Sequence, residues 1–302
     1  MAEPIAFWGN QFVPLADVKL AINDAGFIFG ATATDLCRTF RGKLYRLSEH
    51  LTRFQRSCEY ARIPCRLEPD SLASTATRLV EHNFQLLSAG QELVLVMFAT
   101  PGEIGYYRGQ PGGAGDNIPT LCMHTFPLPF QRYAQHLRDG ARLATVRSDH
   151  ASLLPNAKHR SRLHWWLAEQ TAKQTDPRAN ALVVERDGSV TETASANFLV
   201  VYQGAVHGPR RERILPGISL EAVRSLCLEL GIDFQETDLR VTDRAFLDAE
   251  EAILTSTPYC LAPVSRIDDR QLPVWGPVAE RLLRAWSEQV GVDIRQQIVA
   301  GV

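Results

Sequence analysis

Residues 153–170 read LLPNAKHRSRLHWWLAEQ, and Lys158 in this stretch decides how the chain is interpreted. Four basic side chains follow it closely: His159, Arg160, Arg162 and His164. A lysine with its ordinary pKa near 10.4 is protonated at pH 7 and is a poor nucleophile. Neighbouring cations and burial lower that pKa and release a free amine, which condenses with an aldehyde. A solvated lysine in a basic helix start explains the same residues, so both interpretations stay open here.

The whole chain has the composition of an ordinary globular protein. Its 302 residues favour two domains. Apolar residues make up 45% and charged residues 22%, and the formal net charge is -2 at pH 7. This balance favours neither nucleic acid nor a membrane surface as a partner.

Signals for export, membrane insertion and metal binding are absent from the sequence. The apolar run LVLVMFA at 93–99 has the length of a strand and is too short to span a bilayer. The N-terminus MAEPIAFWGNQ lacks the pattern of a secretory signal. Six scattered cysteines form no C-x-x-C pair and no Cys/His ligand spacing. We expect a cytoplasmic protein with reduced thiols and no metal site.

The first predicted domain is an α+β unit over residues 1–126. The pattern predicts a strand before an RGK turn, a second strand from Leu44 to Leu47, and a helix that Ser48 caps. A second helix over 70–88 would be capped by Asp70, and buried strands are expected at 92–100 and 119–126. The proline-rich stretch 127–131 is the predicted linker.

The second predicted domain covers 132–302 and is also α+β. The helix signals include Pro216-Gly217 at an entry and Gly231 at a stop. The predicted elements are a strand at 142–150, a helix opening in the Lys158 stretch, a hairpin at 180–192 turning at Asp187-Gly188, strands at 196–204 and 249–258, and helices at 215–231 and 277–290.

Several polar residues could hold an anion or a cation, although each has an ordinary structural explanation. Ile218 and Ser219 open a helix whose unpaired N–H groups attract anions, or form a simple Ser-capped helix start. Ser256 and Thr257 end a strand in a way that suits a phosphate, or form a polar loop. Arg53 offers a bidentate guanidinium, or lies on a solvated helix face.

Glu192 is a carboxylate in the otherwise apolar stretch VTETASANF. If buried, it requires a cationic partner such as a protonated pyridine nitrogen. A glutamate at a strand edge that faces water is the alternative.

Five blocks occur in an informative order along the chain: EHLTRFQRS at 49–57, NAKHRSRL at 156–163, DGSVTETASANFLV at 187–200, ILPGIS at 214–219 and TSTPYCLAPV at 255–264. In order and spacing they resemble the fold-type IV pyridoxal-phosphate enzymes, which include branched-chain and D-amino-acid aminotransferases and aminodeoxychorismate lyases. The resemblance implies a small α/β sandwich domain, a larger mixed α/β barrel-like domain, and the cofactor in the interdomain cleft.

The same resemblance implies roles for individual residues. Lys158 matches the lysine that forms an aldimine with pyridoxal phosphate, and Glu192 matches the carboxylate on the pyridine nitrogen. Leu215 matches the residue packed against the ring. The phosphate cup corresponds to Arg53, Ile218, Ser219 and Thr257, with Ser256 beside them. The substrate-pocket wall corresponds to Phe29, Thr34, Leu36 and Arg38. The family also implies a homodimer.

Three departures bear on the substrate. Leu163 stands where branched-chain aminotransferases have a tyrosine, Ala196 replaces their glutamate, and Pro258 has no N–H to offer a carboxylate. We predict a class IV aminotransferase that moves an amino group between an amino acid and a 2-keto acid. The alternatives are a 4-amino-4-deoxychorismate lyase, which KHRSRL and TETASAN also resemble, and a non-catalytic pyridoxal-phosphate-binding protein.

Overall fold

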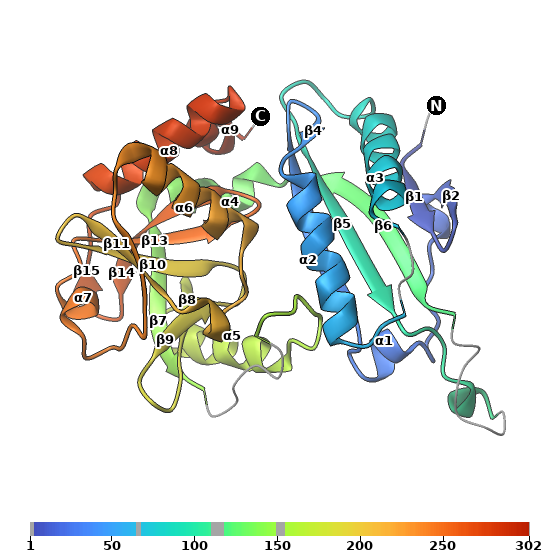
Figure 1. Ribbon diagram of the computed structural model, residues 1–302, viewed down its shortest axis with the longest axis horizontal. Helices are drawn as coiled ribbons and strands as arrows, with labels where there is room; N and C mark the ends of the chain where they lie inside the picture. The colour runs from blue at the N-terminus through green and yellow to red at the C-terminus, as the bar shows by residue number, and fades with distance from the viewer. Residues whose placement is uncertain (1–2, 65–67, 110–117, 149–154, 302) are drawn as a thin grey trace. The chain divides into compact units, whose positions relative to one another are not determined.

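The computed structural model describes residues 3–64, 68–109, 118–148 and 155–301. The chain forms two compact units, the first from Met1–Leu128 with Ala157–Arg162 and the second from Pro129–Asn156 with Leu163–Val302 (Figure 1). The six residues 157–162, which include Lys158, therefore pack with the first unit, although they lie within the segment that the sequence assigned to the second domain.

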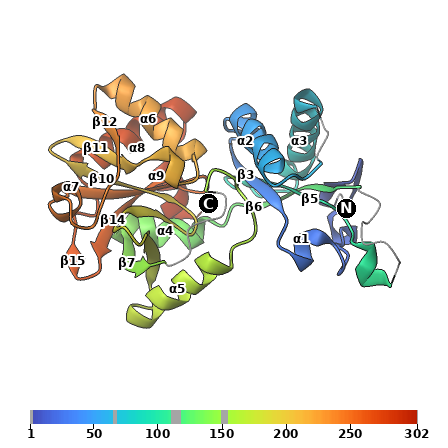
Figure 2. The same cartoon turned by 60° about the horizontal axis from the view of Figure 1, so that its bottom comes forward.

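The first unit is a six-stranded antiparallel sheet in the order β2-β1-β6-β5-β3-β4, with two long helices over it (Figures 1 and 2). Its elements are β1 (Ile5–Trp8), β2 (Gln11–Pro14), η1 (Leu15–Asp17), α1 (Ala25–Ile28), β3 (Ala33–Phe40), β4 (Lys43–Leu44), α2 (Leu47–Tyr60), α3 (Pro69–Phe84), β5 (Leu93–Thr100), η2 (Gly105–Arg108) and β6 (Thr120–Pro127).

Alternation along the strands gives this sheet two different faces. Ala33 and Cys37 of β3 lie in one apolar core with Phe54 of α2 and Leu79 of α3. Because successive side chains of a strand point to opposite faces, Thr34, Leu36 and Arg38 lie on the face away from the helices.

The second unit combines a nine-stranded sheet with six helices among its described residues. Its elements are α4 (Phe130–Asp139), β7 (Ala141–Arg147), α5 (Leu163–Thr175), β8 (Ala179–Val184), β9 (Val190–Thr193), β10 (Asn197–Tyr202), β11 (Ala205–Pro209), η3 (Arg211–Arg213), α6 (Ile218–Leu230), β12 (Phe234–Thr237), α7 (Arg244–Leu247), β13 (Glu251–Ser256), β14 (Cys260–Ile267), β15 (Arg270–Gln271), α8 (Pro277–Val290) and α9 (Ile294–Ala300).

This sheet closes on itself. Its order runs β12-β11-β10-β13-β14-β7-β8-β9, and β9 pairs back onto β10 through Glu192 and Asn197. The parallel strands β7 and β8 are joined by α5, whose Ala168 and Ala172 pack on them. A small sandwich-like unit and a larger barrel-like unit confirm the predicted fold class, and Glu192 lies where the barrel closes.

Most predicted elements are present, but several helix boundaries were wrong. α2 begins at Leu47 after Arg46, so Ser48 is not its cap and the second strand ends at Leu44. Glu68, not Asp70, precedes α3. The short helix α1 and the helices α4 and α9 were not predicted. No helix among the described residues is long and apolar enough to cross a membrane, and these residues contain no cluster of metal-ligand side chains.

Candidate active site

Lys158 does not open a helix, as the sequence suggested, because α5 begins five residues later at Leu163. Residues 158–160 instead run beside the start of β3. The Thr34 N–H donates to the Lys158 carbonyl and the Arg160 N–H donates to the Thr32 carbonyl, both at 2.9 Å. Ala33 and His159 form an antiparallel bridge between these bonds. The lysine is thus fixed to the sheet edge by backbone pairing.

Lys158 differs from every other lysine of the chain. Lysine occurs at positions 19, 43, 158 and 173, and Lys158 is half-buried whereas Lys19, Lys43 and Lys173 are exposed. On the α2 side the Lys158 N–H donates to the Ser57 hydroxyl at 3.0 Å. Burial with these fixed contacts limits the motion of its main chain, which suits a lysine that must present its amine in one place.

The histidines beside Lys158 do not add positive charge at neutral pH. Burial lowers the pKa of His159, and the charges of Arg162 and Lys158 lower it further. Burial likewise lowers the pKa of His50 on α2, where Arg53 and Lys158 oppose the stabilising charge of Asp35. Both rings are therefore neutral at pH 7, and the predicted crowd of cations behind Lys158 does not include His159.

Arg53 is held by a carboxylate that the sequence analysis did not single out. Asp35 of β3 is fully buried and accepts from Arg53 Nε and Nη2 at 2.8 Å each, while His50 Nδ1 lies 2.7 Å from it. Burial would raise the pKa of Asp35, but Arg53 and His50 hold it well below its usual range. Arg53 thus lies on a buried face rather than the solvated one.

A chain of hydrogen bonds ties this group to Lys158. The Ser57 hydroxyl donates to the Arg53 carbonyl at 2.8 Å and accepts from the Lys158 N–H. The only sequence signal for Asp35 was an acidic residue inside an apolar strand, since its partners lie 15 and 18 positions away.

In the second unit, Glu192 is oriented by two donors. Its carboxylate accepts from Asn197 Nδ2 at 2.9 Å and from the Leu215 N–H at 3.2 Å. Asn197 also donates to the Leu215 carbonyl at 2.9 Å, so β9, β10 and the segment before α6 meet around one side chain. Glu192 is half-buried, which matches neither a strand edge in water nor a closed core position.

The start of α6 offers unused donors. Gly217 precedes the helix and provides no side-chain cap, and no described group accepts from the N–H groups of Ile218, Ser219 or Leu220. A Cβ on Gly217 would lie 2.0 Å from Asn197 Oδ1, so only glycine fits there. Free amides at the positive end of a 13-residue helix form an arrangement that binds anions.

Other residues with predicted roles are placed as follows. The Ser256 hydroxyl at the end of β13 donates to the Ser195 carbonyl at 2.7 Å, whereas Thr257 follows in a half-buried turn. Leu215 is half-buried, and its N–H is used by Glu192. These assignments remain predictions.

The residues of the predicted substrate-pocket wall differ in exposure: Phe29 lies at the surface of the first unit, whereas Thr34, Leu36 and Arg38 lie on β3 and are buried or half-buried. Phe29 is 65% exposed after α1, while the Thr34 hydroxyl donates to the Met97 carbonyl. Leu36 is half-buried. Arg38 is 1% exposed and its guanidinium lies 3.9 Å from the centroid of Phe40, so it is part of a packed layer.

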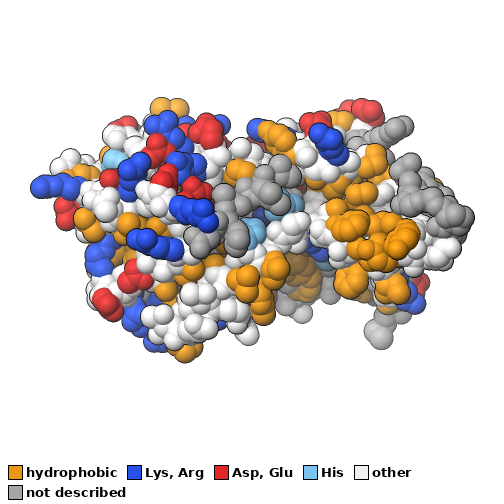
Figure 3. Space-filling model, turned by 90° about the horizontal axis from the view of Figure 1, so that it is seen from below, with side chains coloured by type: hydrophobic (Ala, Val, Ile, Leu, Met, Phe, Trp, Pro, Cys, Tyr) orange, Lys and Arg blue, Asp and Glu red, His pale blue; other side chains and the backbone are white. Residues whose placement is uncertain are grey.

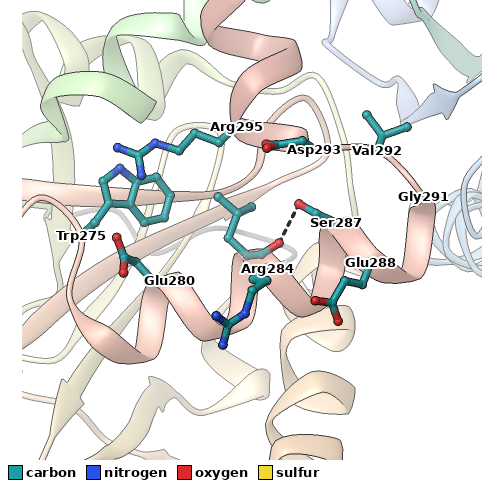
Figure 4. Close-up of a pocket in the computed structure, with 10 residues that line it drawn as sticks. Trp275, Glu280, Arg284, Ser287, Glu288, Gly291, Val292, Asp293 and Arg295 are labelled. Atoms are coloured by element: carbon teal, nitrogen blue, oxygen red, sulfur yellow. Dashed lines mark hydrogen bonds between the residues drawn. The ribbon is translucent and has the colours of Figure 1, made fainter.

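Several pockets lie in the described part of the second unit, and two of them differ in their relation to the predicted site residues. The smaller, about 130 Å³, is lined by Glu192 together with His164, Trp165 and Arg213. The larger, about 490 Å³, lies between α8 and α9, where Arg295 stacks 4.8 Å from the Trp275 ring (Figure 4). None of the residues predicted for the site lines the larger pocket, which has both acidic and basic side chains in its lining.

The chemical groups of the predicted site residues suit pyridoxal phosphate. A half-buried amine can react with an aldehyde, a guanidinium and open helix amides can bind a phosphate, and an oriented carboxylate can hold a protonated ring nitrogen.

Comparisons with known proteins agree with this chemistry. The family model described as Amino-transferase class IV matches residues 32–267. The D-alanine aminotransferase of Bacillus licheniformis is 29% identical over 271 residues, which are 89% of this chain and 90% of the relative. The D-alanine aminotransferase of Staphylococcus haemolyticus is 27% identical over 300 residues, which cover 94% of this chain and 97% of the relative.

Solved structures share the fold. The Escherichia coli branched-chain amino acid aminotransferase superposes with a TM-score of 0.82 at 20% identity, covering 95% of this chain and 94% of that one. A second branched-chain amino acid aminotransferase, complexed with N-(5'-phosphopyridoxyl)-L-glutamate, gives 0.79 at 22% identity, covering 99% and 97%. The relatives are aminotransferases, so the lyase alternative is not favoured. The chain belongs to the class IV aminotransferase family, whose members depend on pyridoxal phosphate.

Proposed function

We propose that this chain binds pyridoxal phosphate through Lys158 and moves an amino group between an amino acid and a 2-keto acid. The observation that carries the proposal is the placement of Lys158. It is the half-buried lysine of the chain, and its main chain is bonded on both sides, to β3 and to Ser57 of α2. A lysine kept for solubility requires neither feature.

Each part of the cofactor has residues that are expected to hold it. Arg53 and the N–H groups of Ile218 and Ser219 would bind the phosphate, with Ser256 and Thr257 beside them. Leu215 would pack against the ring. The buried Asp35 keeps two Arg53 nitrogens in one orientation, so the guanidinium is rigid before any phosphate arrives.

Once bound, pyridoxal phosphate supplies an aldehyde carbon that takes up an amine and a ring that withdraws electrons. Lys158 Nζ would attach the cofactor, and would then carry a proton from the substrate's Cα as a general base. Glu192 would hold a proton on the ring nitrogen, because its charge favours the protonated form. Asn197 and the Leu215 N–H fix the direction of that carboxylate.

We also propose that the chain acts as a homodimer. The segment around α1 and the segment before η2 lie side by side, joined by the Ile104 N–H to the Asn23 carbonyl at 2.9 Å. The segment around α1 exposes Ile22, Phe27 and Phe29, η2 exposes Tyr106, and Ile118 is exposed shortly before β6. Hydrophobic side chains gather on this end of the first unit (Figure 3). Such a patch is typical of a protein interface.

Light scattering of the purified protein should give twice the 33.7 kDa chain mass. Phe27→Glu, which places a charge in the patch, should shift the mass toward that of one chain, whereas the exposed Leu228→Glu on α6 should not. A wild-type protein that scatters as one chain would remove the dimer from the proposal.

Borohydride reduction followed by peptide mapping tests the central assignment. Four lysines are available, and we expect the reduced pyridoxyl adduct on Lys158 alone. Lys158→Ala should lose both the adduct and turnover, while the exposed Lys173→Ala on α5 should keep both. An adduct on Lys19, Lys43 or Lys173 would show that the assignment is wrong.

A further inference from the structure

The segment 158–160, which pairs with β3 through His159, places two basic residues, Lys158 and Arg160, at the edge of the first unit's sheet. His159 pairs with Ala33, whose side chain faces the helices, so the next residue faces away from them. Arg160 therefore lies on the face that holds Thr34, as its contact with Phe98 shows, two residues after Lys158. The Cα atoms of Lys158 and Arg160 are at most about 7 Å apart, the span of two residues of a fully extended chain.

The Arg160 guanidinium has a defined seat on this face. It lies 4.9 Å from the centroid of Phe98, which is 9% exposed and pairs with Thr34 and Cys122 in the neighbouring strands. His124 of β6 lies beside the same ring at 6.5 Å. Burial and the charge of Arg160 lower the pKa of His124, so this imidazole is neutral at pH 7 and does not compete for an anion.

Arg160 lacks the carboxylate partner that many arginines of this protein have. Arg53 is paired with Asp35 and Arg213 with Glu185, whereas no acidic group in the described part of the chain lies within ion-pair distance of Arg160. Stacking on Phe98 holds the guanidinium in place without neutralising it. Its planar set of N–H donors is then available to an external carboxylate.

We propose that Arg160 binds a carboxylate of the amino-acid and keto-acid substrates. The inference rests on the proposed function and adds a residue that recognises the substrate class. The amine and the carboxylate of an α-amino acid are attached to one carbon, so a carboxylate site is expected close to the reacting amine. A substrate whose amine reacts beside Lys158 carries its carboxylate within reach of a long side chain two residues away in the chain. A distal carboxylate, as in a dicarboxylic substrate, has the same chemistry.

Binding of a non-reacting pair of ligands tests the proposal without turnover. On the cofactor-loaded protein, calorimetry should show that 3-methylbutanoate binds about tenfold to a hundredfold more tightly than 3-methylbutanamide, the range of one charge-assisted contact. Arg160→Gln should remove this difference and leave the amide unchanged. Equal binding of acid and amide by the wild type, or a difference that survives in Arg160→Gln, would overturn the proposal.

A matched control separates binding from packing. The exposed Arg78 of α3 lies 4.6 Å from the Phe12 ring in the same unit, so Arg78→Gln removes a comparable stacked guanidinium and should bind both ligands as the wild type does. Arg160→Lys keeps the positive charge but lacks the paired N–H donors of the guanidinium, so it should retain part of the preference for the acid. This variant keeps the test usable if Arg160→Gln does not fold.

Kinetics then identify which carboxylate is bound. In Arg160→Gln, a KM raised for both pyruvate and 2-oxoglutarate with kcat less affected assigns the α-carboxylate, and a KM raised for 2-oxoglutarate alone assigns the distal one. Unchanged KM values for both would overturn the proposal. A wild type that transaminates no donor would instead overturn the proposed function, and the binding comparison would still decide the role of Arg160.

Discussion

The helices α6 and α8 of the second unit begin in the same way and differ in what lies before them. Each helix follows a glycine in extended conformation, Gly217 before α6 and Gly276 before α8. Glycine is required at both positions because a Cβ would collide with a polar side chain, that of Asn197 at Gly217 and that of Glu251 at Gly276. At α8 the carboxylate of Glu251 accepts from the N–H groups of Val278 and Ala279, at 2.9 Å each. At α6 no described group accepts from the equivalent amides.

The two helices therefore differ in where their anion comes from. At α8 the anion is a side chain of the protein, whereas at α6 it would have to be a bound ligand. The positive end of α8 is neutralised by a buried side chain, so it supports stability. The positive end of α6 remains open beside Glu192 and Asn197, which belong to the candidate site. A helix start that stays uncapped next to such residues is expected to be completed by a ligand.

The largest expected effect is the loss of the internal anion of α8. Glu251→Ala leaves two buried N–H groups without acceptors, and we expect the free energy of unfolding to fall by about 2–6 kcal/mol. Urea unfolding of the cofactor-free protein measures this. The exposed Glu280→Ala in the first turn of α8 should change it by less than about 1 kcal/mol. Similar losses in the two variants would show that Glu251 is not the cap.

Asp35 should behave like Glu251, because it also provides an internal anion. Asp35→Ala leaves the buried Arg53 without its carboxylate, and breaking such a pair typically lowers the free energy of unfolding by about 3–5 kcal/mol. Cofactor affinity should fall as well, since Arg53 loses its orientation. Exposed Asp70→Ala on α3 is the control for both measurements. A stable Asp35→Ala protein with normal cofactor affinity would contradict the role of Asp35.

A pair of proline substitutions tests the comparison directly. Ser219 and Val278 are both second residues of their helices, where proline is sterically tolerated but removes the N–H. Val278→Pro should destabilise the cofactor-free protein by about 1.5–3 kcal/mol, because it removes a charge-assisted bond. Ser219→Pro should change that stability little and weaken pyridoxal phosphate binding about tenfold to a hundredfold in a titration. Unchanged cofactor affinity would mean that the α6 amides are not used.

Features that depend on neighbouring residues in the chain could be predicted from the sequence, whereas features that depend on distant residues could not. The boundaries of α8 at Pro277 and Val290 were predicted correctly, since apolar spacing and the proline and glycine at its ends are local signals. The open amides of α6 followed from the same kind of signal. The cap of α8 was not predicted, because Glu251 lies 27 positions before Val278.

Long-range pairing also explains the principal error. The stretch after Lys158 carries a helix-like pattern, but residues 158–160 pair with β3 about 125 positions earlier in the chain, and α5 starts only at Leu163. Without that pairing, nothing in the sequence indicated that Arg160 lies over Phe98, or that Asp35 holds Arg53.

The smallest expected effect concerns the pH dependence of the α8 cap. Burial raises the pKa of Glu251, and the nearby Glu250 and Glu280 add to this, while the bonds from Val278 and Ala279 oppose it. The folded protein therefore binds the Glu251 proton more tightly than the unfolded chain does. The associated stability is fully present below the unfolded pKa of about 4.3 and is lost as the pH rises through the folded value. The difference in unfolding free energy between the wild type and Glu251→Gln, measured from pH 4 to pH 8, should decrease with rising pH. An increase over that range would mean that the two N–H bonds outweigh burial and lower the Glu251 pKa below that of the unfolded chain.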